Sequence, residues 1–114
     1  MNVIEIAERL EAEVLCAVNK DELQVERAFA SDLMSDVLTL TTDSLLLVTG
    51  LANMQTIRTS EMAEIKNILF VRNKKPTKEM LDLAASEGIN IMVCNKSMFA
   101  ACGELYSAGL APVY

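Results

Sequence analysis

The sequence has 114 residues, of which 52% are hydrophobic and 23% charged, so one packed domain over residues 1–114 is expected and a disordered chain is excluded. Sixteen acidic residues against ten basic ones give a net charge of −6, which disfavours nucleic acid and an anionic membrane as partners. The chain has no His and only three Cys, without C-x-x-C spacing, so a zinc site, a disulfide framework and His-based catalysis lose their support.

The amino-terminal segment has no basic flank followed by an apolar run, so it does not resemble a signal peptide. No stretch reaches the ~20 apolar residues that a membrane helix needs. We therefore expect a cytoplasmic protein with no bound cofactor and no metal.

Hydrophobic periodicity and turn residues predict the elements of the first third of the chain. Asn2, with Glu5 three positions later, is an N-cap signal. A turn is expected at Asn19-Lys20-Asp21. Two Ser/Asp pairs, Ser31-Asp32 and Ser35-Asp36, are good helix starters and indicate helix caps. The elements predicted here are a helix over 2–12, strands over 14–18 and 26–30, and a short helix over 35–40.

Strand, loop and helix then alternate three times. The segment 44–48 is nearly all apolar, as expected of a central strand covered on both faces. A later helix begins at Pro76 or Thr77 and ends at Gly88, and the last one is capped by Ser97. The predicted strands cover 44–48, 68–71 and 89–93, and the predicted helices cover 54–64, 77–88 and 98–109.

Three successive βα units imply parallel strands. The predicted fold class is therefore α/β, a three-layer domain with a mostly parallel central sheet of about five strands and helices on both faces. The short apolar tail, residues 110–114, either packs against the domain or covers a partner subunit.

Candidate ligand-binding residues follow the predicted strands, because ligands of open parallel sheets bind beyond the carboxyl ends of the strands. Thr49, Gly50 and Asn53 offer a hydroxyl, an accessible backbone and an amide to a carboxylate or phosphate. The alternative is that Gly50 only makes the turn and Asn53 only caps the helix. The candidate ligand-binding residues are Ser31, Asp32, Thr49, Gly50, Asn53, Arg72, Asn73 and Asn95.

A basic cluster follows the strand over 68–71, in an otherwise acidic protein. It consists of Arg72, Lys74, Lys75 and Lys78. These side chains either steer an anionic ligand toward the same edge of the sheet or form a solvated turn.

Three further residues raise the question of catalysis or metal binding. Asp32 and Asp36 lie four positions apart, but two carboxylates without a third ligand make a poor metal site, and helix capping explains them better. Cys94 is either a reactive thiol or, as its apolar surroundings favour, a buried residue. The phosphate-loop, G-x-G-x-x-G, G-x-S-x-G and H-E-x-x-H motifs are all absent, so the sequence does not predict an enzyme.

Four segments of the chain resemble the DRTGG domain family in order and spacing, and the likeness covers nearly the whole chain. They are Ala30–Leu38, Leu47–Gly50, Phe70–Thr77 and Leu81–Ala84. That family is similar in fold to the N-terminal domain of HPr kinase and to the UDP-binding domain of the Mur ligases. It occurs as an accessory domain in phosphotransacetylases and CBS-containing pyrophosphatases.

The resemblance implies a regulatory or dimerising part. Stand-alone family members near hydrogenase and redox-signalling genes further imply a protein partner in such a system. The D-R-T-G-G string itself is absent from this sequence, and so is the phosphate-loop domain of HPr kinase, so kinase activity is not carried over.

The leading hypothesis is a non-catalytic regulatory and dimerisation module that acts through protein–protein contacts as a homodimer. The alternative is a small-molecule sensor that holds a nucleotide or another anion at the carboxyl edge of the sheet, near Thr49, Asn53, Arg72 and Asn95. A small enzyme that uses Asp32 or Cys94 is the third and least supported hypothesis.

Overall fold

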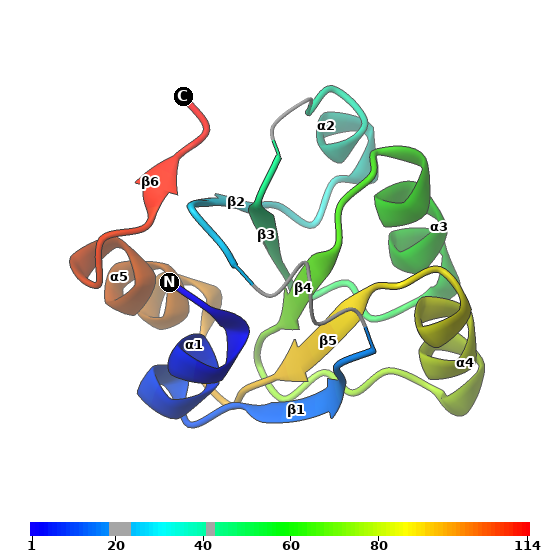
Figure 1. The fold of residues 1–114 in the computed structure, drawn as a ribbon, viewed down its shortest axis with the longest axis horizontal. Helices are drawn as coiled ribbons and strands as arrows, with labels where there is room; N and C mark the ends of the chain where they lie inside the picture. The colour runs from blue at the N-terminus through cyan, green and yellow to red at the C-terminus, as the bar shows by residue number, and fades with distance from the viewer. Residues whose placement is uncertain (19–23, 41–42) are drawn as a thin grey trace.

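The computed structural model describes residues 1–18, 24–40 and 43–114. Figure 1 shows one central sheet with α1 and α5 on one side and α3 and α4 on the other. The turn expected at Asn19-Lys20-Asp21 lies outside the described residues. The elements in chain order are α1 (Val3–Leu10), β1 (Glu13–Cys16), β2 (Arg27–Ala30), α2 (Met34–Val37), β3 (Leu45–Thr49), α3 (Met54–Met62), β4 (Asn67–Phe70), α4 (Lys78–Ser86), β5 (Asn90–Val93), α5 (Met98–Ser107) and β6 (Ala111–Pro112).

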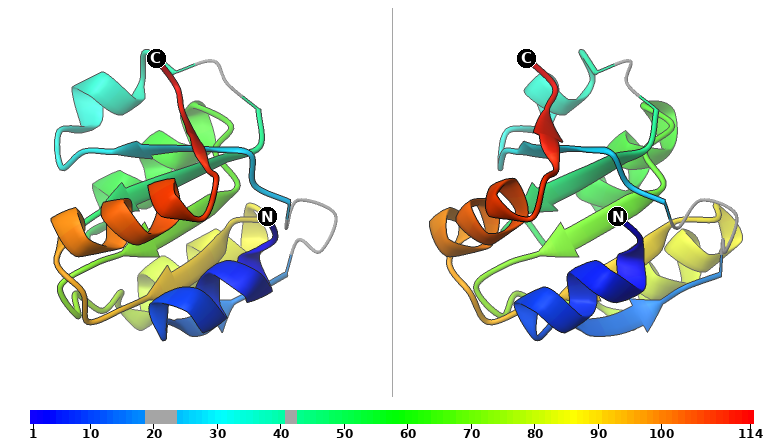
Figure 2. Two further views of the ribbon diagram at one scale, coloured as in Figure 1. Left: turned by 90° about the vertical axis from the view of Figure 1, so that its left-hand side faces the viewer. Right: turned by 60° about the vertical axis from the view of Figure 1, so that its left-hand side comes forward.

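The sheet has the strand order β1-β5-β4-β3-β2-β6. Strands β2, β3, β4 and β5 are parallel to one another, which confirms the mostly parallel sheet expected from the successive βα units. β1 is antiparallel to β5. The tail forms a sixth strand, β6, which lies parallel beside β2 (Figure 2). The sequence does not predict this strand, because it has only two residues, one of them Pro112.

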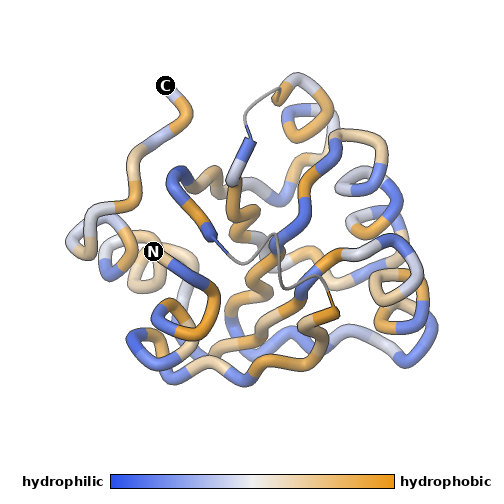
Figure 3. The backbone as a smooth tube through the Cα atoms, in the orientation of Figure 1, coloured by the Kyte–Doolittle hydropathy of each residue, from blue (hydrophilic) through white to orange (hydrophobic). Residues whose placement is uncertain are grey.

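The core is formed on both faces of the sheet, because β3, β4 and β5 bury every residue. Side chains along a strand alternate between faces. Leu45 and Leu47 of β3 therefore belong to the apolar cluster under α3 and α4, whereas Leu46 and Val48 belong to the cluster under α1 and α5. Figure 3 shows hydrophobic segments concentrated in these central strands. The predicted position of residues 44–48 as a central strand is confirmed.

Side-chain caps begin the four longer helices. In each of them, an oxygen or hydroxyl of the N-cap residue accepts a hydrogen bond from the backbone N–H three positions later. The N-cap residues are Asn2, Asn53, Thr77 and Ser97. The predicted caps of α1 and α5 are thus confirmed.

The short helix α2 differs from this pattern. Its N-cap is Leu33, which makes no side-chain capping bond, so the expectation that Asp32 and Asp36 act as helix caps is wrong. Ser31 instead accepts a hydrogen bond from the N–H of Leu33 at 2.9 Å, which forms a local turn. This turn leaves the carboxylate of Asp32 available for other partners.

Within the part of the chain that the structure describes, no helix combines the length and the apolar character that crossing a bilayer requires.

Candidate functional site

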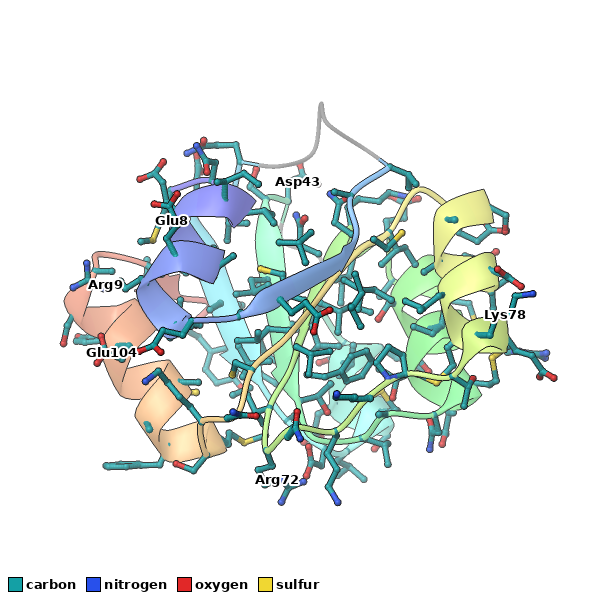
Figure 4. The ribbon with its side chains drawn as sticks, turned by 90° about the horizontal axis from the view of Figure 1, so that it is seen from below. Glu8, Arg9, Asp43, Arg72, Lys78 and Glu104 are labelled. Atoms are coloured by element: carbon teal, nitrogen blue, oxygen red, sulfur yellow. The ribbon has the colours of Figure 1, made fainter. Side chains whose placement is uncertain are left out.

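Four strands end at one edge of the sheet, because β2, β3, β4 and β5 run in the same direction. The loops that follow them carry most of the residues that the sequence singles out. In Figure 4, Arg72 marks this edge, and Asp43, which precedes β3, lies at the opposite edge. We call this the carboxyl edge of the sheet.

Asp32 joins three strand ends at the carboxyl edge. Its Oδ1 accepts hydrogen bonds from the hydroxyl of Thr49 at 2.9 Å and from the backbone N–H of Gly50 at 2.7 Å. Its Oδ2 accepts from Nη2 of Arg72 at 3.2 Å, which is also an ion pair. The structure thus brings together Asp32, Thr49, Gly50 and Arg72, four of the candidate ligand-binding residues that the sequence indicates.

The backbone of the β4–α4 loop positions the Arg72 side chain. Arg72 and Asn73 have φ values of 57° and 54°, in the left-handed region that non-glycine residues rarely adopt. Two hydrogen bonds fix this turn against the next loop, from Arg72 N to Lys96 O and from Asn73 N to Cys94 O, both at 2.8 Å. The turn holds the backbone of Arg72 in place while its guanidinium reaches Asp32.

Gly50 leaves room for the guanidinium of Arg72 and does not serve a left-handed turn, since Gly50 has no positive φ. A Cβ at this position would lie 2.7 Å from Cζ and 2.8 Å from Nε of Arg72, closer than side-chain atoms pack. The interpretation that Gly50 merely makes the turn is therefore incomplete, because the missing side chain provides the space in which Arg72 lies.

The environment of Asp32 lowers the pKa of its carboxyl group below the ordinary value of 3.8. Desolvation is the largest single contribution and acts in the opposite direction, because it favours the neutral acid. The hydrogen bonds from Gly50 and Thr49, together with the positive charge of Arg72, outweigh it. Asp32 is therefore ionised at neutral pH and its ion pair with Arg72 is intact.

Asn53 has a local role. Its Oδ1 accepts from the N–H of Thr56 at 3.1 Å and from the Thr56 hydroxyl at 3.3 Å, so it caps α3 as the alternative interpretation states. The structure does not bring Asn53 into the hydrogen-bonded group around Asp32.

Asn73 and Asn95 line a second part of the carboxyl edge, a polar hollow of about 330 Å³. Lys75, Glu11 and Glu13 also contribute to its lining. Sequence reasoning missed the two glutamates, because only the antiparallel orientation of β1 brings the start of that strand to this edge. Lys74 and Lys78 are exposed, as a solvated turn predicts.

Burial raises the pKa of all three thiols, those of Cys16, Cys94 and Cys102. Cys94 is buried, and burial raises the pKa of its thiol, although Lys96 partly offsets that effect. This agrees with the interpretation of Cys94 as a buried residue. Among residues 1–18, 24–40 and 43–114, no three His, Cys, Asp or Glu side chains gather in a group that could hold a metal ion.

A separate surface feature is the exposed side of α5. The hydrophobic periodicity of the sequence does not predict this exposure. Phe99 is 90% exposed and Tyr106 is 71% exposed. Phe99 lines a shallow hollow of about 330 Å³ together with Ala100, Gly103, Glu104 and Ser107. No heavy atom lies within 4 Å of the position of a Cβ on Gly103, so this part of the helix is open. We call Phe99, Ala100, Gly103, Glu104, Tyr106 and Ser107 the α5 face.

Comparison with known proteins gives a match of fold. No family model matches the chain, and no curated protein matches it significantly in sequence. A solved structure of the CBS and DRTGG domains of the regulatory region of Clostridium perfringens pyrophosphatase, in complex with the activator diadenosine tetraphosphate, is similar with a TM-score of 0.80. Its sequence is 13% identical, and the match covers 98% of this chain but 48% of that one.

The comparison supports a DRTGG-like α/β fold, as the sequence motifs imply. The chain spans about half the length of this structural neighbour. The neighbour belongs to a regulatory region and not to a catalytic one. At this level of identity the likeness shows the fold alone.

Proposed function

We propose that the chain is a non-catalytic regulatory module that acts through protein contacts, and that its α5 face docks on the same face of a second copy. The observation that carries this proposal is the exposure of Phe99 beside an open hollow on the same helix. A surface that carries both a projecting aromatic ring and a depression suits an isologous contact, in which each copy supplies both parts.

The spacing along α5 supports self-docking. In an antiparallel pair of α5 helices centred on Gly103, Phe99 of one copy lies opposite Ser107 of the other, because both are four residues from the centre. Gly103 then permits close approach of the two backbones. Each buried aromatic side chain removes about 150–250 Å² of surface from water.

Charge also favours a second copy at this surface. The whole chain has a net charge of −6, so most approaches of two copies are repulsive. Glu104 is the one charged residue among the ten of α5, and its carboxylate lies 3.7 Å from Nε of Arg9 (Figure 4). The α5 face is thus a nearly neutral surface on an acidic protein.

Sedimentation equilibrium of the purified chain tests this proposal. We expect the mass of two chains for the unmodified protein and the mass of one chain for Phe99→Asp, because a carboxylate there would be buried without a partner. Met62→Asp is the matched control, since Met62 is 69% exposed on α3 and should leave the dimer unchanged. A single-chain mass at every concentration, or a Phe99→Asp variant with unchanged mass, would refute the proposal.

A second candidate function is an anion sensor at the carboxyl edge. It is favoured by one observation, the convergence of the Thr49 hydroxyl, the Gly50 N–H and the Arg72 guanidinium on a single carboxylate. These are the donor types that bind phosphate groups. The neighbour's nucleotide activator makes a nucleotide the first class of ligand to examine here.

A thermal-shift screen against nucleotides and small anions tests the sensor candidate, because a ligand of the native state raises Tm by mass action. We expect a ligand-dependent rise in the unmodified chain that Arg72→Ala abolishes. Lys78→Ala, which removes an exposed charge from the same basic cluster, should keep the rise. A flat screen would leave the interaction module as the better account.

A further inference from the structure

We propose that the carboxylate of Asp32 is a tethered anion that occupies a binding site for the phosphate group of a ligand. The site consists of the Thr49 hydroxyl, the Gly50 N–H and the Arg72 guanidinium, which we call the donor cluster. This inference deepens the anion-sensor candidate, on which it rests, by stating what closes the site when no ligand is bound.

The arrangement of donors supports the inference. Three donors from the ends of β3 and β4 surround one carboxylate, two of them on Oδ1 and one on Oδ2, at 2.7 to 3.2 Å. A phosphate presents oxygens of the same charge and similar spacing, and it offers more of them to a guanidinium that carries five N–H donors. The donor cluster is therefore not specific for a carboxylate.

The donors are held by the interior of the sheet. Thr49 is fully buried at the end of β3, and Gly50 is buried beside it. The backbone of Arg72 is fixed by its hydrogen bond to Lys96 and by the adjacent bond from Asn73 to Cys94. The donor cluster thus keeps its backbone geometry whether or not Asp32 is present.

Asp32 lies on the connection between β2, whose outer neighbour β6 has two residues, and α2, which has four. Met34 and Val37 hold α2 in the core, whereas Asp32 and the neighbouring Leu33 are exposed. The side chains of Asp32 and Arg72 are 44% and 49% exposed, so a phosphate in solution can reach them.

The covalent attachment of Asp32 to the chain determines how strongly its carboxylate competes with free phosphate for the donor cluster. A group on a short linker acts at an effective concentration on the order of millimolar. Free phosphate binds only those unmodified molecules in which Asp32 has left the donor cluster, so its measured affinity falls in proportion to the fraction of molecules in which the site is open. Lys74 and Lys75, which follow Arg72 and are exposed, add positive potential for a dianion.

Asp32→Ala, studied with inorganic phosphate as the probe, tests the inference. We expect phosphate, compared with chloride at equal ionic strength, to raise the Tm of Asp32→Ala at concentrations about tenfold lower than it needs for the unmodified chain, or lower still. The double variant Asp32→Ala, Arg72→Gln should lose this response. Asp36→Ala, which removes an exposed carboxylate four residues away, should respond like the unmodified chain.

Two results would overturn the inference. One is an equal phosphate response in Asp32→Ala, Asp36→Ala and the unmodified chain. The other is a response of Asp32→Ala that persists in the double variant, since phosphate would then bind elsewhere. If Asp32→Ala does not fold, Asp32→Asn keeps the shape of the side chain without its charge and should show the same direction of change, and its failure to do so counts equally against the inference.

The same data separate this inference from the sensor candidate. A flat nucleotide screen with a phosphate-responsive Asp32→Ala supports the tethered anion and removes the nucleotide ligand. A nucleotide response that needs Arg72, with no gain of phosphate affinity in Asp32→Ala, keeps the sensor and overturns the tethered anion.

Discussion

At the scale of single residues, the contact between Gly50 and Arg72 explains why the carboxyl edge has its geometry. The guanidinium lies where a side chain of residue 50 would begin, so the ion pair with Asp32 depends on a hydrogen atom at that position. Because Gly50 has no positive φ, its backbone conformation is open to alanine. The atoms nearest to a Cβ there all belong to the guanidinium of Arg72, so we expect the cost of a substitution to come mainly from that side chain.

Gly50→Ala should therefore destabilise the unmodified protein but not a protein that already lacks the guanidinium. In an Arg72→Ala background, the same change should be neutral or stabilising by about 0.4–1 kcal/mol, since alanine restricts the unfolded chain. We expect a coupling free energy of about 0.5–1 kcal/mol between the two substitutions in a urea-denaturation cycle. Additive effects would show that the guanidinium does not lie over Gly50.

At the scale of elements, a buried pair of amides aligns β4 with β5. Nδ2 of Asn90 donates to Oδ1 of Asn67 at 3.0 Å, and the two residues are register partners at the start of their strands. A slip of one residue would turn every side chain of a strand to the opposite face. The surrounding strand residues are apolar on both faces and specify this register only weakly.

Asn90→Leu should cost about 1–3 kcal/mol of unfolding free energy, because it removes a buried donor to Asn67. The double variant with Asn67→Leu should cost less than the sum of the two single changes, since neither amide then remains. Urea denaturation of the four proteins measures both quantities. Fully additive costs would mean that the two side chains stabilise the sheet independently.

The sequence predicts most of the elements, because their signals are local. Strands such as β3 are marked by apolar runs, and N-caps such as Asn2 and Ser97 act within one helical turn. The strand β6 could not be predicted, because a strand of two residues is too short to show an alternation of apolar and polar residues. Its place beside β2 depends on pairing with residues 84 positions earlier in the chain. Asp32 was assigned to a helix cap for a similar reason, as its actual partners come from β3 and β4.

The candidate site was predictable only in part. Parallel strands must end at one edge, so the loops that carry Thr49 and Arg72 could be placed together from the sequence. The direction of each side chain could not, because it depends on the left-handed backbone of Arg72 and on the space above Gly50. The α5 face could not be predicted either, because the sequence pattern of a helix is the same whether Phe99 is exposed or buried.

At the scale of the whole molecule, two surfaces carry the proposals, the carboxyl edge and the exposed side of α5, the helix that follows the β5 loop at that edge. The carboxyl edge is polar and charged, whereas the α5 face exposes Phe99 and Tyr106 and has one charged residue, Glu104, which is paired with Arg9. A module with both surfaces can bind a partner through one while the other stays accessible. Association through α5 is the central claim, because regulation by contact requires it.

A dilution series followed by backbone amide NMR tests that claim most directly, since it reports both the occurrence and the place of association. We expect amide shifts of Met98–Ser107 to change with protein concentration, while those of Gly50, Arg72 and Asn73 stay constant. Spectra that do not depend on concentration, with the relaxation of a single chain, would contradict the claim. So would concentration-dependent shifts confined to residues outside α5.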